Sequence, residues 1–402
     1  MKITIRKNRS SEFGFKYLWL IILAPKVLQF AIYLIWILIL ALHNHPKKTR
    51  EMRVLLGFVA IHFLSIVWQL MLGNVSILDE RFFAAINTVL IWFISVASYG
   101  IFANRSTPIK IERISKYMMN NLLILFCIYL IYKTSHLTSF TVGPLHYYLS
   151  RADYLETGRT TRFVGLMENV VGVTHLFCLA FPISLLSVKK IKSIILKSIY
   201  CIICYIPVIE CHSRIGIIVG GIMTLFGIIF LLYDQKTIKR WQIVCVICMS
   251  LAFLLFYTIL SYRDFISEFL ELANSRTGSN STRMAIYSES IAMTVKESIL
   301  IGIGVKYMRG HYPYGSHSTY IGVFYKTGII GSFFFVSALF ALLKKLIQKA
   351  KSNRSMILII LMDILYFAIL VLTDLDGSNW YIVTRFILWA LLIYQCNSID
   401  EI

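Results

Sequence analysis

Two arginines and a histidine in or beside polar segments of the sequence are the candidates for chemistry. Arg214 follows His212 and Ser213 and precedes the apolar run 215–233. An ionisable residue at the mouth of a membrane-spanning segment is a candidate functional residue, although an arginine there can also extend its charge to lipid headgroups. The sequence therefore offers Arg214 as a candidate anion-binding residue, with an interfacial structural role as the alternative.

Arg283 lies in the polar stretch NSRTGSNSTRMAIYSESI. Residues 279–281 favour the N-cap of a helix, so they predict a surface helix over 282–298 with Arg283 in its first turn. A guanidinium beside the free N–H groups of a helix N-terminus suits phosphate or pyrophosphate. A solvated first-turn arginine is the alternative, and Arg276 is a weaker candidate for the same role.

His317 stands in HYPYGSHSTYIGVFYKTGIIG, where a long polar segment returns to an apolar run. A neutral imidazole can accept a proton near physiological pH. A single histidine is more often a hydrogen-bonded structural residue, so both interpretations stay open. His311 is nearby but has no apolar run directly behind it.

Other patterns point less clearly to chemistry. Asp374 and Asp376 have the D-x-D spacing of a metal site, but that spacing is common and a third ligand is missing nearby. The C-x-x-C pairs at 201/204 and 245/248 lie inside apolar runs, where small residues serve helix packing. We therefore predict neither a metal nor another cofactor.

The composition assigns the chain to a class. Its 402 residues are 58% hydrophobic and only 15% charged, with a formal charge of +20 and a mean hydropathy of +0.72. Soluble domains are about 45–50% apolar and about 25% charged, and disordered chains are poor in apolar residues. A nucleic-acid-binding protein is also excluded, because its basic charge accompanies a polar surface. The chain is predicted to be an integral membrane protein.

Apolar segments recur along the whole chain, and a helix that crosses a bilayer takes roughly 20 residues. The first, 15–42, is interrupted by Pro25 and Lys26 and predicts a broken or re-entrant pair. We expect an all-α polytopic membrane protein, a single integral domain with about eleven or twelve transmembrane helices. The other segments cover 54–72, 82–103, 118–132, 163–187, 193–209, 215–233, 242–260, 318–343, 356–372 and 381–394.

Alternate loops differ in charge. The loops 42–54, 103–116, 188–197, 234–240 and 344–354 together hold twenty Lys and Arg residues against three acidic ones. Positive loops stay in the cytoplasm, so these loops are predicted to be cytoplasmic. The two long loops, 133–162 and 261–317, are then external. The second is predicted to carry short surface helices, over 264–273 and 282–298.

Taken together, the order of these segments resembles the O-antigen ligase/polymerase superfamily. The matching pieces are RFVGLMENVVG, SRIGIIVGG, STRMAIYSESI, ILIGIGVKY and SHSTYIGVFYKTGIIG, which lie between residues 162 and 331. The sequence departs from the family at Met167-Glu168-Asn169, where Asn-Pro-Asn is frequent, and at Ser318, where Asn commonly follows the histidine.

The resemblance implies a membrane glycosyltransferase of the GT-C type that inverts the anomeric centre without a metal. By position, Arg214 and Arg283 match arginines that hold pyrophosphate, and His317 matches the histidine of the acceptor or catalytic step. Arg162, Asn169, Arg276 and Tyr320 are the expected substrate-binding residues. The implied substrates are glycans linked to undecaprenyl pyrophosphate, both donor and acceptor.

The predicted function is therefore a polysaccharide repeat-unit polymerase of the inner membrane, with its site facing the periplasm or cell exterior. A chain-length regulator protein is a possible partner, membrane lipid surrounds the chain, and nucleic acid is not expected. An O-antigen ligase that transfers the polymer to the lipid A core is the nearest alternative. A transporter or flippase for lipid-linked glycans is the alternative of another class.

Overall fold

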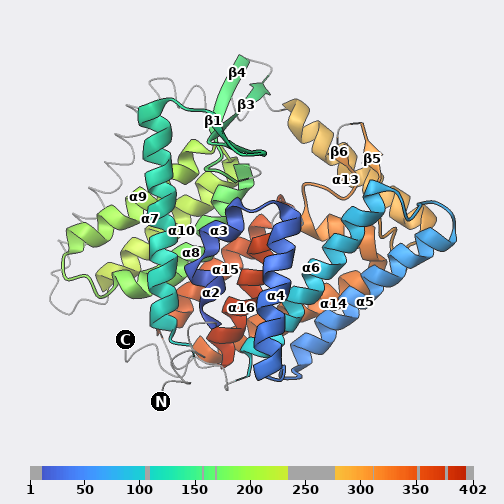
Figure 1. Ribbon diagram of the computed structural model, residues 1–402, viewed down its shortest axis with the longest axis horizontal. Coiled ribbons are helices and arrows are strands. Elements are labelled where there is room, and N and C mark those ends of the chain that lie inside the picture. Colours follow the sequence, from blue (N-terminus) through green and yellow to red (C-terminus); the bar gives the residue numbers. More distant parts are fainter. Residues whose placement is uncertain are drawn as a thin grey trace. The chain divides into compact units, whose positions relative to one another are not determined.

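The computed structural model describes residues 11–104, 109–155, 158–167, 170–233, 277–310, 312–350, 354–375 and 379–394. The chain forms two compact units (Figure 1). The first comprises Met1–Arg113 together with Arg283–Ile402, and the second comprises Ile114–Thr282. Two predicted elements, the span 242–260 and the surface helix 264–273, lie outside the described residues.

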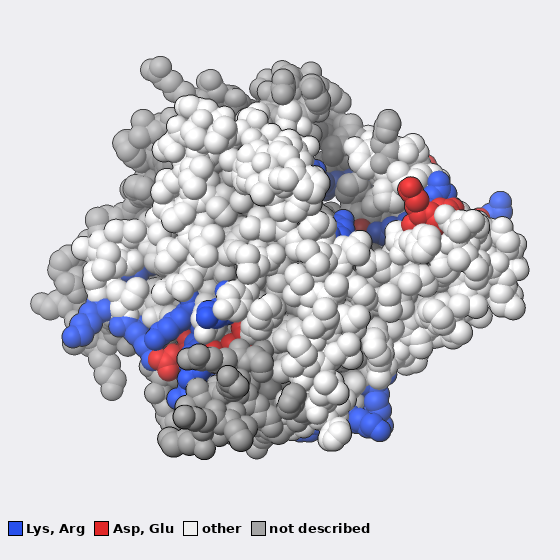
Figure 2. Space-filling model, viewed as in Figure 1, with Lys and Arg blue, Asp and Glu red and all other residues white. Residues whose placement is uncertain are grey.

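The described part of the chain is a bundle of apolar helices. Six of its helices are long and apolar enough to cross a membrane: α5 (Arg50–Met71), α6 (Glu80–Phe102), α7 (Ile111–Ser135), α8 (Val170–Val188), α10 (Arg214–Tyr233) and α14 (Thr319–Ala350). Shorter apolar helices are α4 (Lys26–His43), α9 (Ile194–Glu210), α15 (Arg354–Ile369) and α16 (Asn379–Tyr394). Figure 2 shows an uncharged surface over α4, α5 and α6. The predicted all-α polytopic membrane fold is confirmed.

The first unit is built around an aromatic core. Helix α5 packs against α6 and α14, and α16 packs against α6. Trp92 of α6 lies at the centre, with its ring centroid 5.2 Å from that of Phe58, 5.7 Å from Phe335 and 5.8 Å from Phe386. All three ring pairs meet edge to face, the arrangement that the quadrupoles of aromatic rings favour. This core joins α5, α6, α14 and α16.

The predicted cytoplasmic loops of the first unit gather at one end of its helices. Lys345, near the end of α14, forms an ion pair of 2.9 Å with Glu51 at the beginning of α5. The N–H of Lys47 donates to the carbonyl of Gly100 at 2.8 Å, and its ammonium lies over the ring of Tyr394, the last residue of α16. The alternation of loops predicted from charge therefore holds within this unit.

The opposite end of the first unit carries the segment between α13 (Thr277–Glu297) and α14. This segment includes the small hairpin β5 (Met308–Arg309) and β6 (Tyr312–Pro313), which lies beside α13 in Figure 1. The hydroxyl of Tyr307 donates to the carbonyl of Asn74 in the loop between α5 and α6, at 3.3 Å. The segment is therefore fixed to the helix ends beneath it.

Helix α14 is broken at Gly328, which has a φ of 59° within an otherwise helical run. Segment 299–304 supplies the interrupted hydrogen bonds. Two of its N–H groups donate to the carbonyls of Tyr325 and Lys326 at 2.8 and 3.0 Å, and two of its carbonyls accept from the residues that follow Gly328. A side chain at Gly302 would meet the backbone nitrogen of Gly328 at 2.5 Å. Such a break is tolerated within a bundle because neighbouring segments supply partners for the backbone groups that it frees.

The N-terminal apolar segment is broken as the sequence predicts. Helices α2 (Phe13–Lys16) and α3 (Leu18–Leu23) precede Pro25, and α4 begins at Lys26. Proline lacks an N–H and restricts the residue before it to an extended conformation, and Ala24 has a ψ of 145°. The interruption therefore follows directly from Pro25.

The second unit holds α8, α9 and α10 packed against one another, together with two hairpins. The hairpins are β1 (Ser139–Val142) with β2 (Leu145–Tyr148), and β3 (Ser150–Leu155) with β4 (Gly158–Phe163). The sequence predicted only a loop here, with a span beginning at Phe163. That boundary is wrong, because Phe163 ends β4 and α8 begins at Val170.

The predicted orientation can be tested on the first unit with one cysteine at each end. Ser288 on α13 and Lys344 on α14 are both exposed. We expect an impermeant maleimide to label Ser288→Cys in intact cells, and Lys344→Cys only after lysis, because positive loops are retained in the cytoplasm. The unsubstituted chain gives the background, and labelling of the Lys344→Cys variant alone in intact cells would reverse the orientation.

Candidate functional site

His317 lies just before α14, held in a backbone conformation that few residues other than glycine adopt. Its φ is 65°, in the left-handed region where histidine occurs more often than most residues. The hydroxyl of Tyr287 on α13 donates to the carbonyl of His317 at 2.9 Å. The ring of Tyr312 lies 5.4 Å from the imidazole, inclined by 62°. Such a strained residue persists only where its surroundings fix it, and strain of this kind concentrates at functional sites.

Helix α13 is docked against the segment that carries His317. The N–H of Gly315 donates to the hydroxyl of Ser290, a fully buried residue, at 2.8 Å. Tyr287 is one turn earlier on α13, and Arg283 is one turn before Tyr287, so these three side chains share a helix face. The docked face therefore carries Arg283 toward the neighbourhood of His317.

The position of Arg283 differs from the sequence prediction in one respect. Helix α13 begins at Thr277, so Arg283 lies in its second turn rather than its first. The predicted placement beside free backbone N–H groups is therefore wrong. The N-cap preference of residues 279–281 is a weak local tendency, and tertiary contacts such as those of Ser290 override it. An anion would therefore bind the guanidinium of Arg283 and not the free N–H groups of the helix start.

The electrostatic surroundings of His317 keep its imidazole neutral. Partial burial lowers the pKa of His317 below its ordinary value of 6.5. The positive charges of Arg283 and Lys306 lower this pKa further, whereas the carboxylate of Asp374 raises it. A neutral imidazole is the form that accepts a proton. His317 has the protonation state of a general base at pH 7.

Asp374 and Lys306 form an ion pair beside this histidine. Their carboxylate oxygen and ammonium nitrogen are 2.7 Å apart. The loop that carries Asp374 is tied to the start of α14, because the hydroxyl of Thr319 donates to the carbonyl of Thr373 at 2.7 Å and accepts from the N–H of Leu375 at 3.2 Å. The sequence offered Asp374 as a metal-ligand candidate. The structure gives its charge an ammonium partner, and Asp376 lies outside the described residues.

A second polar cluster lies in the second unit, at the start of α10. His212 joins α9 to α10 with a φ of 48°. Burial is the largest cause that lowers the pKa of His212, and the charge of Arg162 on β4 lowers it as well, whereas Glu210 raises it. Glu210 is in an ion pair of 2.9 Å with Lys133. The sequence singled out Arg162 but missed the pairing of Lys133 with Glu210.

The remaining predicted residues are placed as follows. Arg214 is the first residue of α10, and its side chain lies outside the described part of the chain, as do Asn169 and Arg276. Tyr320 donates to the carbonyl of Phe367 at 3.2 Å and so links α14 to α15. The structure brings Arg283 and His317 together with Lys306 and Asp374. The convergence of Arg214 on them stays a prediction.

The pH dependence of activity tests the surroundings of His317. If the neutral imidazole of His317 accepts a proton, the acid limb of kcat/KM reports the pKa of His317. This limb then lies below pH 6.5. Asp374→Asn removes a negative charge that favours the imidazolium, so the pKa falls further and the acid limb moves to lower pH. An acid limb that moves upward in this variant would contradict the assignment.

Comparison with known proteins finds a family model that matches part of the chain. Residues 199–336 match the model of a protein family described as O-antigen ligase. The matched third of the chain contains Arg214, Arg283, Lys306 and His317, whereas Arg162 and Asp374 lie outside it. No curated protein matches the chain.

Proposed function

Since residues 199–336 match a family model described as O-antigen ligase, we propose that this chain is an enzyme of the O-antigen ligase/polymerase superfamily that polymerises oligosaccharide repeat units. Its substrates are glycans carried on undecaprenyl pyrophosphate, and it works on the outer face of the cytoplasmic membrane. A growing lipid-linked chain is the donor, and the next lipid-linked unit is the acceptor. A chain-length regulator is a partner that such a reaction can use.

The observation that carries this proposal is a neutral imidazole among cations. Partial burial lowers the pKa of His317, and the nearby charges of Arg283 and Lys306 lower this pKa further. Glycosyl transfer from a pyrophosphate carrier needs a base for the acceptor hydroxyl and cations for the departing pyrophosphate. The described part of the first unit provides both within one group of residues.

The reaction can be written with these residues in defined roles. An acceptor hydroxyl attacks the anomeric carbon of the donor from the face opposite the pyrophosphate and passes its proton to the imidazole of His317. The new glycosidic bond forms as the bond from carbon to the phosphate oxygen breaks, with inversion. The electron pair leaves with undecaprenyl pyrophosphate, which takes up the proton from His317 directly or through water.

Arginine suits the leaving group because its planar guanidinium can donate two parallel hydrogen bonds to phosphate oxygens. We assign this role to Arg283 and Arg214, since a pyrophosphate carries more charge than one arginine matches. Arg162, Asn169, Arg276 and Tyr320 are the proposed glycan-binding residues.

The proposed reaction needs no divalent metal, because arginines stabilise the leaving group and Asp374 is paired with Lys306. We expect the purified enzyme to form polymer at an unchanged rate in excess EDTA. The control is the same preparation with added magnesium or manganese. Complete loss of activity in chelator, with rescue by either ion, would return Asp374 and Asp376 to the centre of the site.

An O-antigen ligase is the second candidate, because the matched family bears that description. A transporter is less favoured, since the buried charges Asp363 and Arg385 within α15 and α16 form an ion pair with each other. The surface glycans of a deletion strain separate the three. Single repeat units on the lipid A core indicate a polymerase, and undecaprenyl-linked polymer that never reaches the core indicates a ligase. Normal polymer that is delivered slowly indicates a transporter.

A further inference from the structure

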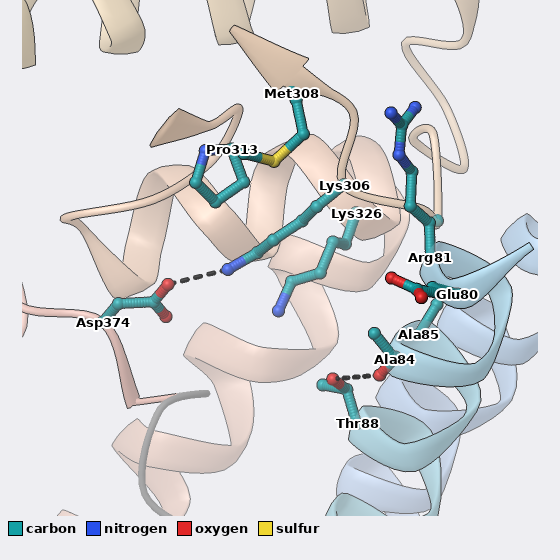
Figure 3. Close-up of a pocket in the computed structure, with 11 residues that line it drawn as sticks. Glu80, Arg81, Ala84, Ala85, Thr88, Lys306, Met308, Pro313, Lys326 and Asp374 are labelled. Atoms are coloured by element: carbon teal, nitrogen blue, oxygen red, sulfur yellow. Dashed lines mark hydrogen bonds and ion pairs between the residues drawn. The ribbon is translucent and has the colours of Figure 1, made fainter. Parts of the chain in front are cut away.

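A charged cavity of about 410 Å³ opens in the first unit beside the group around His317 (Figure 3). Its wall is formed by the first turns of α6, by the segment 304–313, by α14 and by the loop of Asp374. Pockets that bind small ligands measure about 300–1,000 Å³. The cavity therefore has room for about one or two sugar residues rather than a lipid.

The charged side chains on the cavity wall have a net charge of one positive unit. Among the described residues that line it, Arg81, Lys306 and Lys326 are cationic, and Glu80 and Asp374 are carboxylates. Small or apolar residues such as Ala84 complete the wall. This balance suits a ligand with one negative charge and several hydroxyl groups. A pyrophosphate, with two or more charges, would face the repulsion of both carboxylates.

The two lysines are held so that their ammonium groups extend in the same direction. In Figure 3 both point toward the side of the cavity that carries Asp374, while the guanidinium of Arg81 points away from them. Lys306 is oriented by its ion pair of 2.7 Å with Asp374. Arg81 lies 5.9 Å from the ring centroid of Tyr307. The cationic groups available to a ligand in the cavity are therefore the ammonium groups of Lys306 and Lys326.

Lys326 reaches this position because of the break in α14. Lys326 is only 4% exposed. Its backbone carbonyl accepts a hydrogen bond of 3.0 Å from the N–H of Gly304, which also lines the cavity. The hydrogen bonds between 299–304 and the residues around Gly328 fix the backbone on both sides. The lysine is therefore part of a rigid wall, as a residue that selects among substrates must be.

We propose that this cavity binds the carboxylate of an acidic sugar, so that the repeat unit is a glycan that contains a hexuronate. The inference rests on the proposed function for the role of that glycan, and it names the substrate class. Lys306 and Lys326 hold the carboxylate, while Glu80 and Asp374 accept hydrogen bonds from sugar hydroxyls. Since Lys306 and Asp374 also act on His317, the bound sugar lies next to the residue that takes the acceptor proton.

The test measures binding rather than turnover, with the purified full chain in detergent. The probes are glucuronate and galacturonate, each against its neutral hexose, with dissociation constants from ligand-detected NMR. We expect at least one hexuronate to bind about tenfold or more tightly than its hexose, because the ammonium groups form charge-assisted hydrogen bonds with its carboxylate. Lys326→Met should bring the ratio close to one. Lys344→Met, at the exposed far end of α14, is the matched control and should keep it.

Three results would overturn the proposal: equal binding of acid and hexose by the unsubstituted chain, a ratio unchanged by Lys326→Met, or inorganic phosphate that binds more tightly than either hexuronate. The last would assign the cavity to a phosphate. If Lys326→Met does not fold, Lys306→Met removes the other ammonium and must reduce the same ratio. Hexuronate binding by a chain that forms no polymer would refute the proposed function while leaving this site in place.

Discussion

Replacing Arg283 with alanine is expected to lower the rate of polymer formation by about 100- to 1,000-fold, the loss typical of one donor to a developing anion. The guanidinium lies one turn from Tyr287, which binds the backbone of His317, so the change removes charge close to the reacting groups. Arg283→Lys keeps the charge but loses the paired planar donors, and it should recover only a small part of the rate. The measurement is the initial rate of polymer formation with purified enzyme.

The matched control for this variant is Arg53→Ala, an exposed arginine on α5 at the opposite end of the first unit. It should polymerise at the unsubstituted rate with equal expression. If Arg283→Ala also polymerises at that rate, the pyrophosphate is held elsewhere. The role assigned to Arg283 would then be lost, whatever the status of Arg214.

Replacing His317 with alanine is expected to cost about 100- to 10,000-fold in kcat, the range for loss of a general base. Two observations together identify proton transfer: the rate falls and the acid limb of the pH profile disappears. If the imidazole only orients the acceptor, the loss is milder and the acid limb persists. His45→Ala, at an exposed position, is the control, and a His317→Ala enzyme of full activity would contradict any role in the reaction.

The membrane helices could be predicted from the sequence because their signal is local. Hydrophobic runs predicted α5, α6 and α10 to within a few residues, since length and apolar character alone decide that a helix can cross a bilayer. The shorter apolar helix α16 was predicted equally well. Pro25 likewise predicted the break before α4. The hairpins β1 to β4 were missed. Their strands are only four to six residues long, so a strand pattern is too short to be separated from the surrounding loop.

The candidate site was predicted in its residue types but not in its contacts. Arg283 and His317 stood out because an arginine near a helix start suits an anion and a histidine titrates near physiological pH. The ion pair between Lys306 and Asp374 joins residues far apart in the sequence, and a pattern of neighbours cannot reveal it. The break at Gly328 depends in the same way on hydrogen bonds from residues 299–304. Lys326 lies inside the predicted span 318–343, and the sequence does not reveal that it lines a cavity.

We propose that this chain forms glycosidic bonds by displacing undecaprenyl pyrophosphate. The most direct measurement supplies the purified protein, in nanodiscs with EDTA, with a lipid-linked repeat unit and follows both products. We expect polymer together with one undecaprenyl pyrophosphate for each new linkage, and neither product from His317→Ala. Intact repeat units with no pyrophosphate released, from a folded protein supplied with its own organism's substrate, would contradict this proposal.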